Sequence, residues 1–442
     1  MRQVLVALAV VAMVAGTAHA NLLSDNFDDE LLDMTLWQVN TPQGSASNIH
    51  VRVADDFNDN SLDAANWSVN PTLPPWNGTV VEQNQRAEID SRAHLNTLNQ
   101  YDPAATPLRI TGTWSLPSGD FMQILTRCSG LPGGAYGETT SGLEFFYRRD
   151  YPVAGPGDIY IRGRGVSLAN HTTHNQLNIG SYEPYEFTIV DDGLNVSLFV
   201  RDLADPTSYA WAKGQATTDM STDYVTFHNR ESSGTRISYL DDVMVARAPV
   251  LERNDRAELY ARGHLVTRDQ FDPLAVGGNG LIITGEWTFG SDDFLQILTR
   301  SNGLPGGTYG ETQNGIEFYA YNRFDSQGKN YFQIRGRGVG VSTLATINNL
   351  DLGDGDVVNF RIVDTGANLH FWLQEINDPS SWGHIHAYAT TDMANDYIVF
   401  HNREGSRTAY LDNVEIAIYP EPGSIALLGG GILALLRRRR RA

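Results

Sequence analysis

The sequence predicts an all-β protein made of two similar antiparallel β-sandwiches. Three observations lead to this prediction. The chain has 442 residues with 42 glycines, 19 tyrosines, 17 phenylalanines and 8 tryptophans, a composition typical of strands joined by tight turns. Short runs of strand length recur along it, and no amphipathic helix longer than two turns is apparent. A long internal repeat indicates that one such domain is present twice.

The strand pattern is clearest at Phe121 to Arg127, where Phe, Gln, Leu and Arg alternate with Met, Ile and Thr. Asp191-Asp-Gly193 separates two apolar runs and predicts a hairpin turn, as does Asp364-Thr-Gly366 further on. Other runs of strand length are 143–148, 159–164, 187–190, 195–200 and 224–228. About a dozen such strands per copy are typical of a β-sandwich.

The repeat pairs motifs that mostly lie 173 positions apart. Phe121-Met-Gln-Ile-Leu-Thr-Arg127 returns as Phe294-Leu-Gln-Ile-Leu-Thr-Arg300, and His228-Asn-Arg-Glu231 returns as His401-Asn-Arg-Glu404. The pair Ile161-Arg-Gly-Arg-Gly165 and Ile334-Arg-Gly-Arg-Gly338 follows the same rule. The two copies are therefore near twins.

One piece of the second copy stands at the wrong end of the chain. The first copy opens with Asp56-Phe57 and runs to Trp67, and only the segment Phe27 to Trp37 resembles that opening. We therefore predict an insertion: residues 21–52 supply the first strands of an outer domain, 53–248 form an inserted domain, and 249–418 complete the outer one. The alternative is a vestigial third copy, and a Phe27 packed in the 53–248 domain would contradict the insertion.

Both ends of the chain carry segments that we exclude from the fold. Residues 1–20 have a basic start, an apolar core and the small residues Ala18 and Ala20, which predicts a cleaved secretory signal peptide. Residues 419–442 contain Pro420-Glu421-Pro422, an apolar run and five terminal arginines. An apolar helix of 14 residues rises about 21 Å, and flanking arginines help such a short helix to reach across a bilayer.

This tail resembles the PEP-CTERM sorting signal of Gram-negative, often biofilm-forming bacteria. The resemblance implies export, transient inner-membrane association through the short helix, and processing by an exosortase. The protein is then expected at the cell envelope, the outer surface or the extracellular matrix, either released or anchored.

The net charge disfavours some classes of binding partner, and the cysteine content excludes a disulfide within the chain. The formal net charge is −20, and removing Arg2 and the five tail arginines leaves 26 basic against 52 acidic residues, a net charge of −26. Such a surface repels nucleic acid and anionic lipid. Cys128 is the only cysteine, so no intramolecular disulfide forms.

The opening Asp-Phe-x-x-x-x-Leu-Asp-x-x-x-Trp and the closing Tyr239-Leu-Asp-Asp-Val243, with its counterpart Tyr410-Leu-Asp-Asn-Val414, resemble the ends of concanavalin A-like lectin/glucanase jelly rolls, including laminin-G-like modules. The resemblance implies two antiparallel sheets whose first and last strands are adjacent. That adjacency is what the insertion requires.

A polar stripe on one sheet face is the candidate ligand site. Its members are planar polar, charged and aromatic side chains suited to sugars, and arginine forks suit carboxylate or sulfate groups, so we expect an acidic polysaccharide. The alternative is that the arginines only pair with neighbouring acids. The stripe comprises Gln123, Arg127, Tyr136, Glu144, Arg162 and Arg164 in the first copy, and Gln296, Arg300, Tyr309, Glu317, Arg335 and Arg337 in the second.

Catalysis is not expected. Glycoside hydrolases of the resembled superfamily use Glu-x-Asp-x-x-Glu, whereas Glu88-Ile-Asp90-Ser-Arg-Ala93 lacks the last acid. His228 and His401 are interpreted as structural residues.

Calcium is the one cofactor that the sequence suggests, held where first and last strands meet. The candidate ligands are Asp56 or Asp59 with Asp241 or Asp242, and Asp25 or Asp28 with Asp412. We thus expect an exported, non-catalytic protein that binds polysaccharide. The alternatives are a structural or adhesive envelope protein without a specific ligand and, more remotely, a glycoside hydrolase-like enzyme.

Overall fold

The computed structural model describes the chain between residues 21 and 419 with several gaps. The described ranges are 21–28, 32–40, 51–70, 78–90, 92–117, 121–133, 138–148, 157–178, 180–216, 222–230, 236–275, 280–290, 293–306, 311–324, 330–389, 395–403 and 407–419. Within them every helix or strand element is a β-strand. None of these residues forms a helix long and apolar enough to cross a membrane. The leader with Ala18 and Ala20 and the tail with Pro420, Glu421 and Pro422 lie outside the described residues.

The chain forms two compact units. One, the insert unit, runs from residue 50 to Ala248, and the other, the host unit, combines the chain before residue 50 with the chain from Pro249 onward. Each unit contains one nine-stranded and one six-stranded sheet. Neighbouring strands in all four sheets run antiparallel. The predicted all-β class and antiparallel sandwiches are therefore confirmed.

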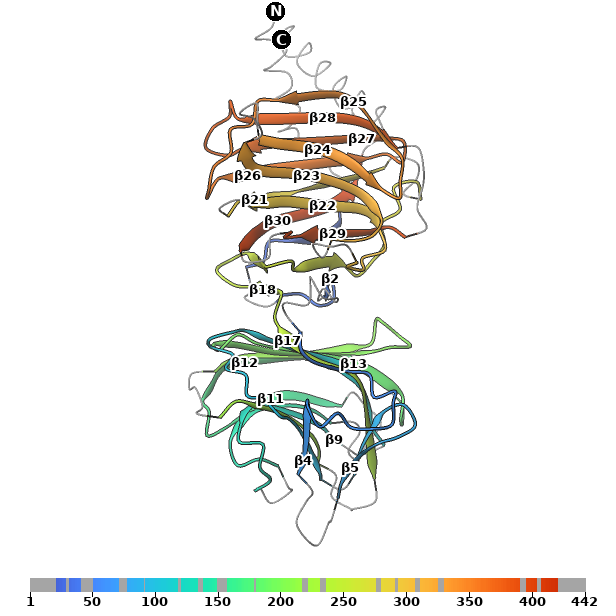
Figure 1. Ribbon diagram of the computed structural model, residues 1–442, viewed down its shortest axis with the longest axis vertical. Helices are drawn as coiled ribbons and strands as arrows, with labels where there is room; N and C mark the ends of the chain where they lie inside the picture. The colour runs from blue at the N-terminus through green and yellow to red at the C-terminus, as the bar shows by residue number, and fades with distance from the viewer. Residues whose placement is uncertain are drawn as a thin grey trace, which may run out of the picture. The chain divides into compact units, whose positions relative to one another are not determined.

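The insert unit shows its two layers plainly in Figure 1, with β12, β13 and β17 in one and β4, β9 and β11 in the other. The nine-stranded sheet runs β12 (Leu168–Asn175), β15 (Tyr209–Ala216), β14 (Asn195–Asp202), β13 (Pro184–Asp191), β8 (Leu108–Ser115), β17 (Ile237–Arg247), β6 (Ala87–Asp90) and β5 (Val80–Glu82), with β3 (Val51–Asp55) also pairing β17. The six-stranded sheet runs β11 (Asp158–Arg164), β10 (Gly142–Arg148), β9 (Phe121–Cys128), β16 (Tyr224–Asn229), β7 (His94–Thr97) and β4 (Trp67–Asn70).

The host unit repeats this order. Its nine-stranded sheet runs β18 (Val250–Glu252), β19 (Ala257–Tyr260), β30 (Thr408–Ile418), β21 (Leu281–Thr288), β26 (Val357–Asp364), β27 (Asn368–Glu375), β28 (Trp382–Ala389) and β25 (Val341–Asn348), with β1 (Asn21–Asp25) also pairing β30. Its six-stranded sheet runs β2 (Trp37–Asn40), β20 (His264–Thr267), β29 (Tyr397–His401), β22 (Phe294–Ser301), β23 (Gly315–Phe324) and β24 (Asn330–Arg337).

The core of the insert unit lies between its two sheets. Trp114 of the nine-stranded sheet packs on Phe227 of the six-stranded sheet, with ring centroids 6.2 Å apart, and both side chains are fully buried. Successive strand residues point to opposite faces, so alternate apolar positions fill this core. On the six-stranded sheet these positions include Leu95, Ile124, Phe145, Ile161 and Phe227.

The first described residues belong to the host unit. Asp25 of β1 lies opposite Val414 of β30, and β2 pairs with β20. Phe27 stacks on Trp37 at 6.0 Å, and Trp37 in turn meets Phe400 edge-on at 5.8 Å. Phe27 and Trp37 thus pack in the host unit. In the sequence, the whole insert unit stands between these two residues and the rest of the host unit.

Candidate functional site

A row of polar side chains crosses the six-stranded sheet of the insert unit on the face opposite the core. We call it the insert row. Its positions alternate with the apolar core residues, and this alternation is what directs them away from the core. The row consists of His94 on β7, His228 on β16, Gln123 on β9, Glu144 on β10, and Arg162 and Arg164 on β11.

Direct contacts link the members of the insert row. The rings of His94 and His228 meet with centroids 4.6 Å apart, and His228 Nδ1 lies 2.5 Å from Gln123 Oε1. Glu144 Oε2 accepts hydrogen bonds from Arg162 Nε at 2.7 Å and from Arg164 Nε at 2.8 Å. One buried carboxylate therefore holds two guanidinium groups side by side.

The host unit carries the equivalent host row, which comprises His264, His401, Gln296, Glu317, Arg335 and Arg337. His264 and His401 meet at 4.2 Å, and His401 hydrogen-bonds Gln296. Glu317 accepts from Gln296, from Arg335 Nη2 at 2.7 Å and from Arg337 Nε at 2.8 Å. In both units a second acid, Glu138 or Glu311, binds the last arginine, with contacts of 2.6 and 3.2 Å.

Burial and charge both act on the central histidines. Burial, followed by the charge of His94, lowers the pKa of His228 well below its usual 6.5, and the next largest contributions come from Arg230, Arg92 and Arg164. Burial and His264 do the same to the pKa of His401, followed by Arg337, Arg403 and Arg262. Both histidines are therefore neutral at pH 7 in a locally positive environment, although the chain as a whole is acidic.

Several buried polar atoms of the two rows have no hydrogen-bond partner among the described residues. They include the Nε2 atoms of His228 and His401 and Oε1 of Glu144. Since His228 uses Nδ1 toward the Gln123 carbonyl, its neutral ring presents Nε2 as an acceptor. A buried acceptor without a donor is costly, but His228, His401 and Glu144 are fully buried, so these atoms do not themselves face a ligand at the surface.

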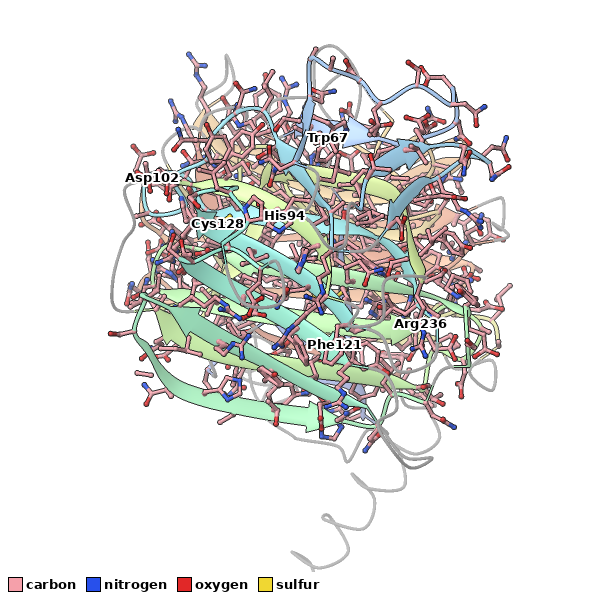
Figure 2. All side chains as sticks on the ribbon, turned by 90° about the horizontal axis from the view of Figure 1, so that it is seen from below. Trp67, His94, Asp102, Phe121, Cys128 and Arg236 are labelled. Carbon is pink, nitrogen blue, oxygen red and sulfur yellow. The ribbon has the colours of Figure 1, made fainter. Side chains whose placement is uncertain are left out.

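Aromatic rings continue the same face beside each row. In the insert unit Phe146 lies between Phe121 at 5.1 Å and Tyr160 at 4.4 Å. In the host unit Phe294 contacts Tyr319 at 5.3 Å and Tyr321 at 3.9 Å. Figure 2 labels Phe121 and His94, which lie on two strands of the insert six-stranded sheet. A polar row with two acid-paired arginines thus adjoins an aromatic strip in both units.

Two arginines of the predicted stripe do not lie on this face. Arg127 is 1% exposed and binds Asp191 of the opposite sheet through Nη2 at 2.5 Å and Nε at 3.1 Å, and Arg300 binds Asp364 in the same way. The cause is a bulge near the end of β9, where the pairing shifts between Tyr224 and Thr226 and Arg127 adopts a φ of 51°. Simple alternation from Phe121 therefore places Arg127 on the wrong side.

The remaining predicted residues have these positions. Gln123, Glu144, Arg162 and Arg164 come together, as do Gln296, Glu317, Arg335 and Arg337, whereas Tyr136 and Tyr309 lie outside the described residues. Glu88 belongs to the nine-stranded sheet of the insert unit, where Gln83 and Arg86 bind its carboxylate.

The carboxylates suggested for calcium mostly accept local hydrogen bonds. Asp25 accepts from the Phe27 amide and the Trp37 indole, and Asp28, Asp56, Asp59, Asp241 and Asp412 each accept from a residue one or two positions away. Burial, then the charges of Asp242 and Asp56, raise the pKa of Asp241, so these acids lie near one another. In the described part of the chain no three His, Cys, Asp or Glu side chains are placed to hold a metal ion. Calcium remains a prediction.

Sequence reasoning missed His94, His264 and the aromatic strip. The two histidines sit in otherwise apolar β-runs, Ala93-His-Leu95 and Gly263-His-Leu265, that carry no motif. Their position in the strand was the available signal. Each histidine comes directly before a buried core leucine, as Glu144 comes directly before Phe145, so its side chain points to the face opposite the core.

Comparisons with known proteins give only distant likenesses. No family model matches the chain, and no curated protein matches it. Among solved structures it is similar to a glycosyl hydrolase family protein from Mycobacterium fortuitum (11% identity, TM-score 0.25, 51% of this chain and 99% of that one). It is also similar to the catalytic domain of an endo-1,3-beta-glucanase from Thermotoga petrophila RKU-1 (12%, 0.24, 47% and 98%) and to the LG1-3 region of the laminin alpha2 chain (13%, 0.23, 75% and 65%). Likeness at this level says nothing of activity.

Proposed function

We propose that the protein binds an acidic polysaccharide, without turnover, through the polar rows and aromatic strips on its two six-stranded sheets. The observation that carries the proposal is the pair of partly exposed arginines, Arg162 and Arg335, which Glu144 and Glu317 hold on these faces. A guanidinium offers several donors in a fixed geometry to the oxygens of a sugar.

Arginine supplies the preference for acidic sugars. Arg162 and Arg335 keep 37% of their side-chain surface exposed while Glu144 and Glu317 hold them from below. A guanidinium fixed in this way retains donors for a carboxylate or sulfate and loses little entropy on binding. The alternative, in which the arginines only pair with neighbouring acids, predicts no retention on acidic polymers.

The aromatic strip supplies the second kind of contact. Sugars present C–H faces that pack on accessible aromatic rings. The half-buried Tyr160 and the exposed Tyr331 lie on β11 and β24, the strands that carry the arginines of each row. Two such faces per chain favour long polymers over short sugars, because a polymer can engage both.

We also infer that the protein acts outside the cell. The leader and the PEP-CTERM-like tail support this location, and both lie outside the described residues. An acidic chain that binds an extracellular polysaccharide through local arginines fits a cell-surface or matrix role.

The test is retention of the purified chain on neutral, uronic and sulfated polysaccharides, with and without calcium. We expect retention on the acidic polymers that weakens as salt rises. Arg162→Ala/Arg335→Ala should reduce affinity at least about ten-fold, since a charge-assisted hydrogen bond contributes about 1.5–3 kcal/mol.

The matched control is Arg201→Ala, which removes an arginine paired with Glu186 at 2.8 Å on the other sheet of the insert unit. It should leave retention unchanged. Absence of retention on every polymer would favour a structural or adhesive protein without a ligand, and new reducing ends would instead reveal an enzyme.

A further inference from the structure

A cluster of histidines lies on the nine-stranded sheet of the host unit, away from the host row. His370 stands on β27, and His384 and His386 stand on β28, the neighbouring strand. His370 lies directly opposite His386, and His384 lies opposite Trp372. All four rings point to the face opposite the core, because they alternate with buried Leu369, Phe371 and Ile385.

The rings of the cluster are almost parallel. The angles between ring planes are 7° for His370 with His384 and with His386, and 13° for His370 with Trp372. Trp372 and His384 stack at 4.6 Å. The imidazole nitrogens distinguish this cluster from the aromatic strips beside the polar rows, because they can donate a lone pair to a further group.

Two of those nitrogens face each other. His370 Nδ1 lies 3.3 Å from His384 Nε2. Two imidazole nitrogens bound to one metal ion at about 2.1 Å each are 3.3 Å apart when the angle at the metal is about 104°. The same distance also suits a hydrogen bond in which the two nitrogens share one proton, and a metal ion can replace that proton.

The twin unit shows that the sandwich does not require these histidines. The repeat places Ser197, Trp211 and Lys213 where the host unit has His370, His384 and His386, and in the insert unit Ser197 pairs with Lys213 in the same register. Three imidazoles therefore distinguish one copy from the other at adjoining positions of an otherwise shared fold.

We propose that His370 and His384 form a two-histidine chelate for a first-row transition metal ion, with Cu²⁺ bound most tightly. Imidazole is a preferred ligand of Cu²⁺, Ni²⁺ and Zn²⁺, and affinity at a nitrogen site peaks at Cu²⁺. Since no three His, Cys, Asp or Glu side chains of the described residues are placed to hold a metal ion, water completes the coordination.

The pair binds a metal ion through neutral imidazole nitrogens, because a protonated ring nitrogen has no lone pair to donate. Arg361 lies over the Trp372 ring at 5.4 Å, and its positive charge opposes a cation. The site is therefore expected to prefer the strongest imidazole binder and to reject hard cations such as Ca²⁺.

The experiment titrates the full chain, stripped with EDTA, with CuSO₄ at pH 7.5, followed by calorimetry and electron paramagnetic resonance. We expect one equivalent of Cu²⁺ with nitrogen hyperfine structure, lost in His370→Gln and in His384→Gln. The controls His386→Gln, beside the pair, and His174→Gln, in the insert unit, should retain it. Thermal melting checks that each variant is folded.

Two results overturn the proposal. One is an unchanged signal and stoichiometry in His370→Gln/His384→Gln, and the other is a parent chain that binds no Cu²⁺. If His386→Gln alone abolishes binding, the assignment of the pair is wrong. None of these readouts depends on polysaccharide binding, so the test stands apart from the proposed function.

Discussion

Arg127 illustrates how a single backbone torsion decides the role of a side chain. Its positive φ turns the guanidinium into the sandwich, where Asp191 receives it together with the hydroxyl of Thr126 at 2.7 Å and the amide of Gly193 at 3.1 Å. The hairpin that the sequence predicted at residues 191–193 is therefore anchored from the other sheet. Arg300 and Asp364 repeat the arrangement in the host unit.

This buried pair leads to a stability prediction. Arg127→Met leaves the Asp191 carboxylate buried without its cation, so it should lower the free energy of unfolding of the insert unit by about 3–5 kcal/mol. Chemical denaturation measures the loss. Arg127→Met/Asp191→Leu should recover much of it, because no unpaired charge remains buried.

Arg201→Met is the matched control for Arg127→Met. Its guanidinium pairs with Glu186 near the surface, with side-chain exposures of 19% and 30%, and exposed pairs contribute at most about 1 kcal/mol. Equal losses in Arg127→Met and Arg201→Met would contradict the account of the buried pair.

At the scale of strands, the rows show that neighbouring strands assemble what no single strand contains. His94, His228 and Gln123 come from β7, β16 and β9, and the register places His228 opposite both of the others. His94 and Gln123 each stand between apolar residues, and His228 stands between Phe227 and Asn229. A polar network therefore forms only because the six-stranded sheet pairs in this order.

The neutral histidines predict how stability depends on pH. The pKa of His228 lies well below 6.5 in the folded state, so below pH 6.5 the unfolded chain takes up a proton that the folded chain does not. The contribution of the neutral histidine to the free energy of unfolding is therefore fully present above pH 6.5. It is lost as the pH falls, by up to about 1.4 kcal/mol per pH unit for each such histidine.

Melting temperatures measured from pH 7.5 to pH 5 check this expectation. His228→Gln should flatten the decrease, whereas His174→Gln, on the other sheet of the same unit, should leave the slope as it is. A slope that His228→Gln does not change would show that other groups govern the acid response.

At the scale of the whole molecule, the chain order and the spatial order differ. β1 and β2 begin the described chain, yet they pair with β30 and β20, and the insert unit occupies the sequence between them and their partners. Phe27 and Phe57 are equivalent, fully buried residues, one in each unit. Asp25 and Asp55 hold the indoles of Trp37 and Trp67 in the same way, at 2.6 and 2.7 Å.

This equivalence gives a matched pair of variants. Phe27→Ala should destabilise the host unit and Phe57→Ala the insert unit, each by about 3–5 kcal/mol. Hydrogen exchange followed by mass spectrometry reads the units separately, for example at β21 and β8. Faster exchange in β8 after Phe27→Ala, with β21 unaffected, would contradict the assignment of Phe27 to the host unit.

Local patterns made much of the fold predictable. Alternation at residues 121–126, the turn motifs at 191–193 and 364–366 and the repeat of near-identical segments predicted strands, hairpins and two like sandwiches. Four of the six residues of the insert row followed from the same alternation, since Gln123, Glu144, Arg162 and Arg164 do share a face. In a regular strand, successive side chains point to opposite faces, so the local sequence pattern predicts the face on which each residue lies.

The tertiary structure decided the rest, because the remaining features depend on contacts between distant strands. The bulge that buries Arg127 arises from pairing with β16, about a hundred residues later, and carries no local signal. His94 becomes part of a site only beside His228, and His370 faces His384 only because β27 and β28 pair in one register. By itself the sequence determined the class, the duplication and the charge, whereas packing across sheets determined which polar groups meet.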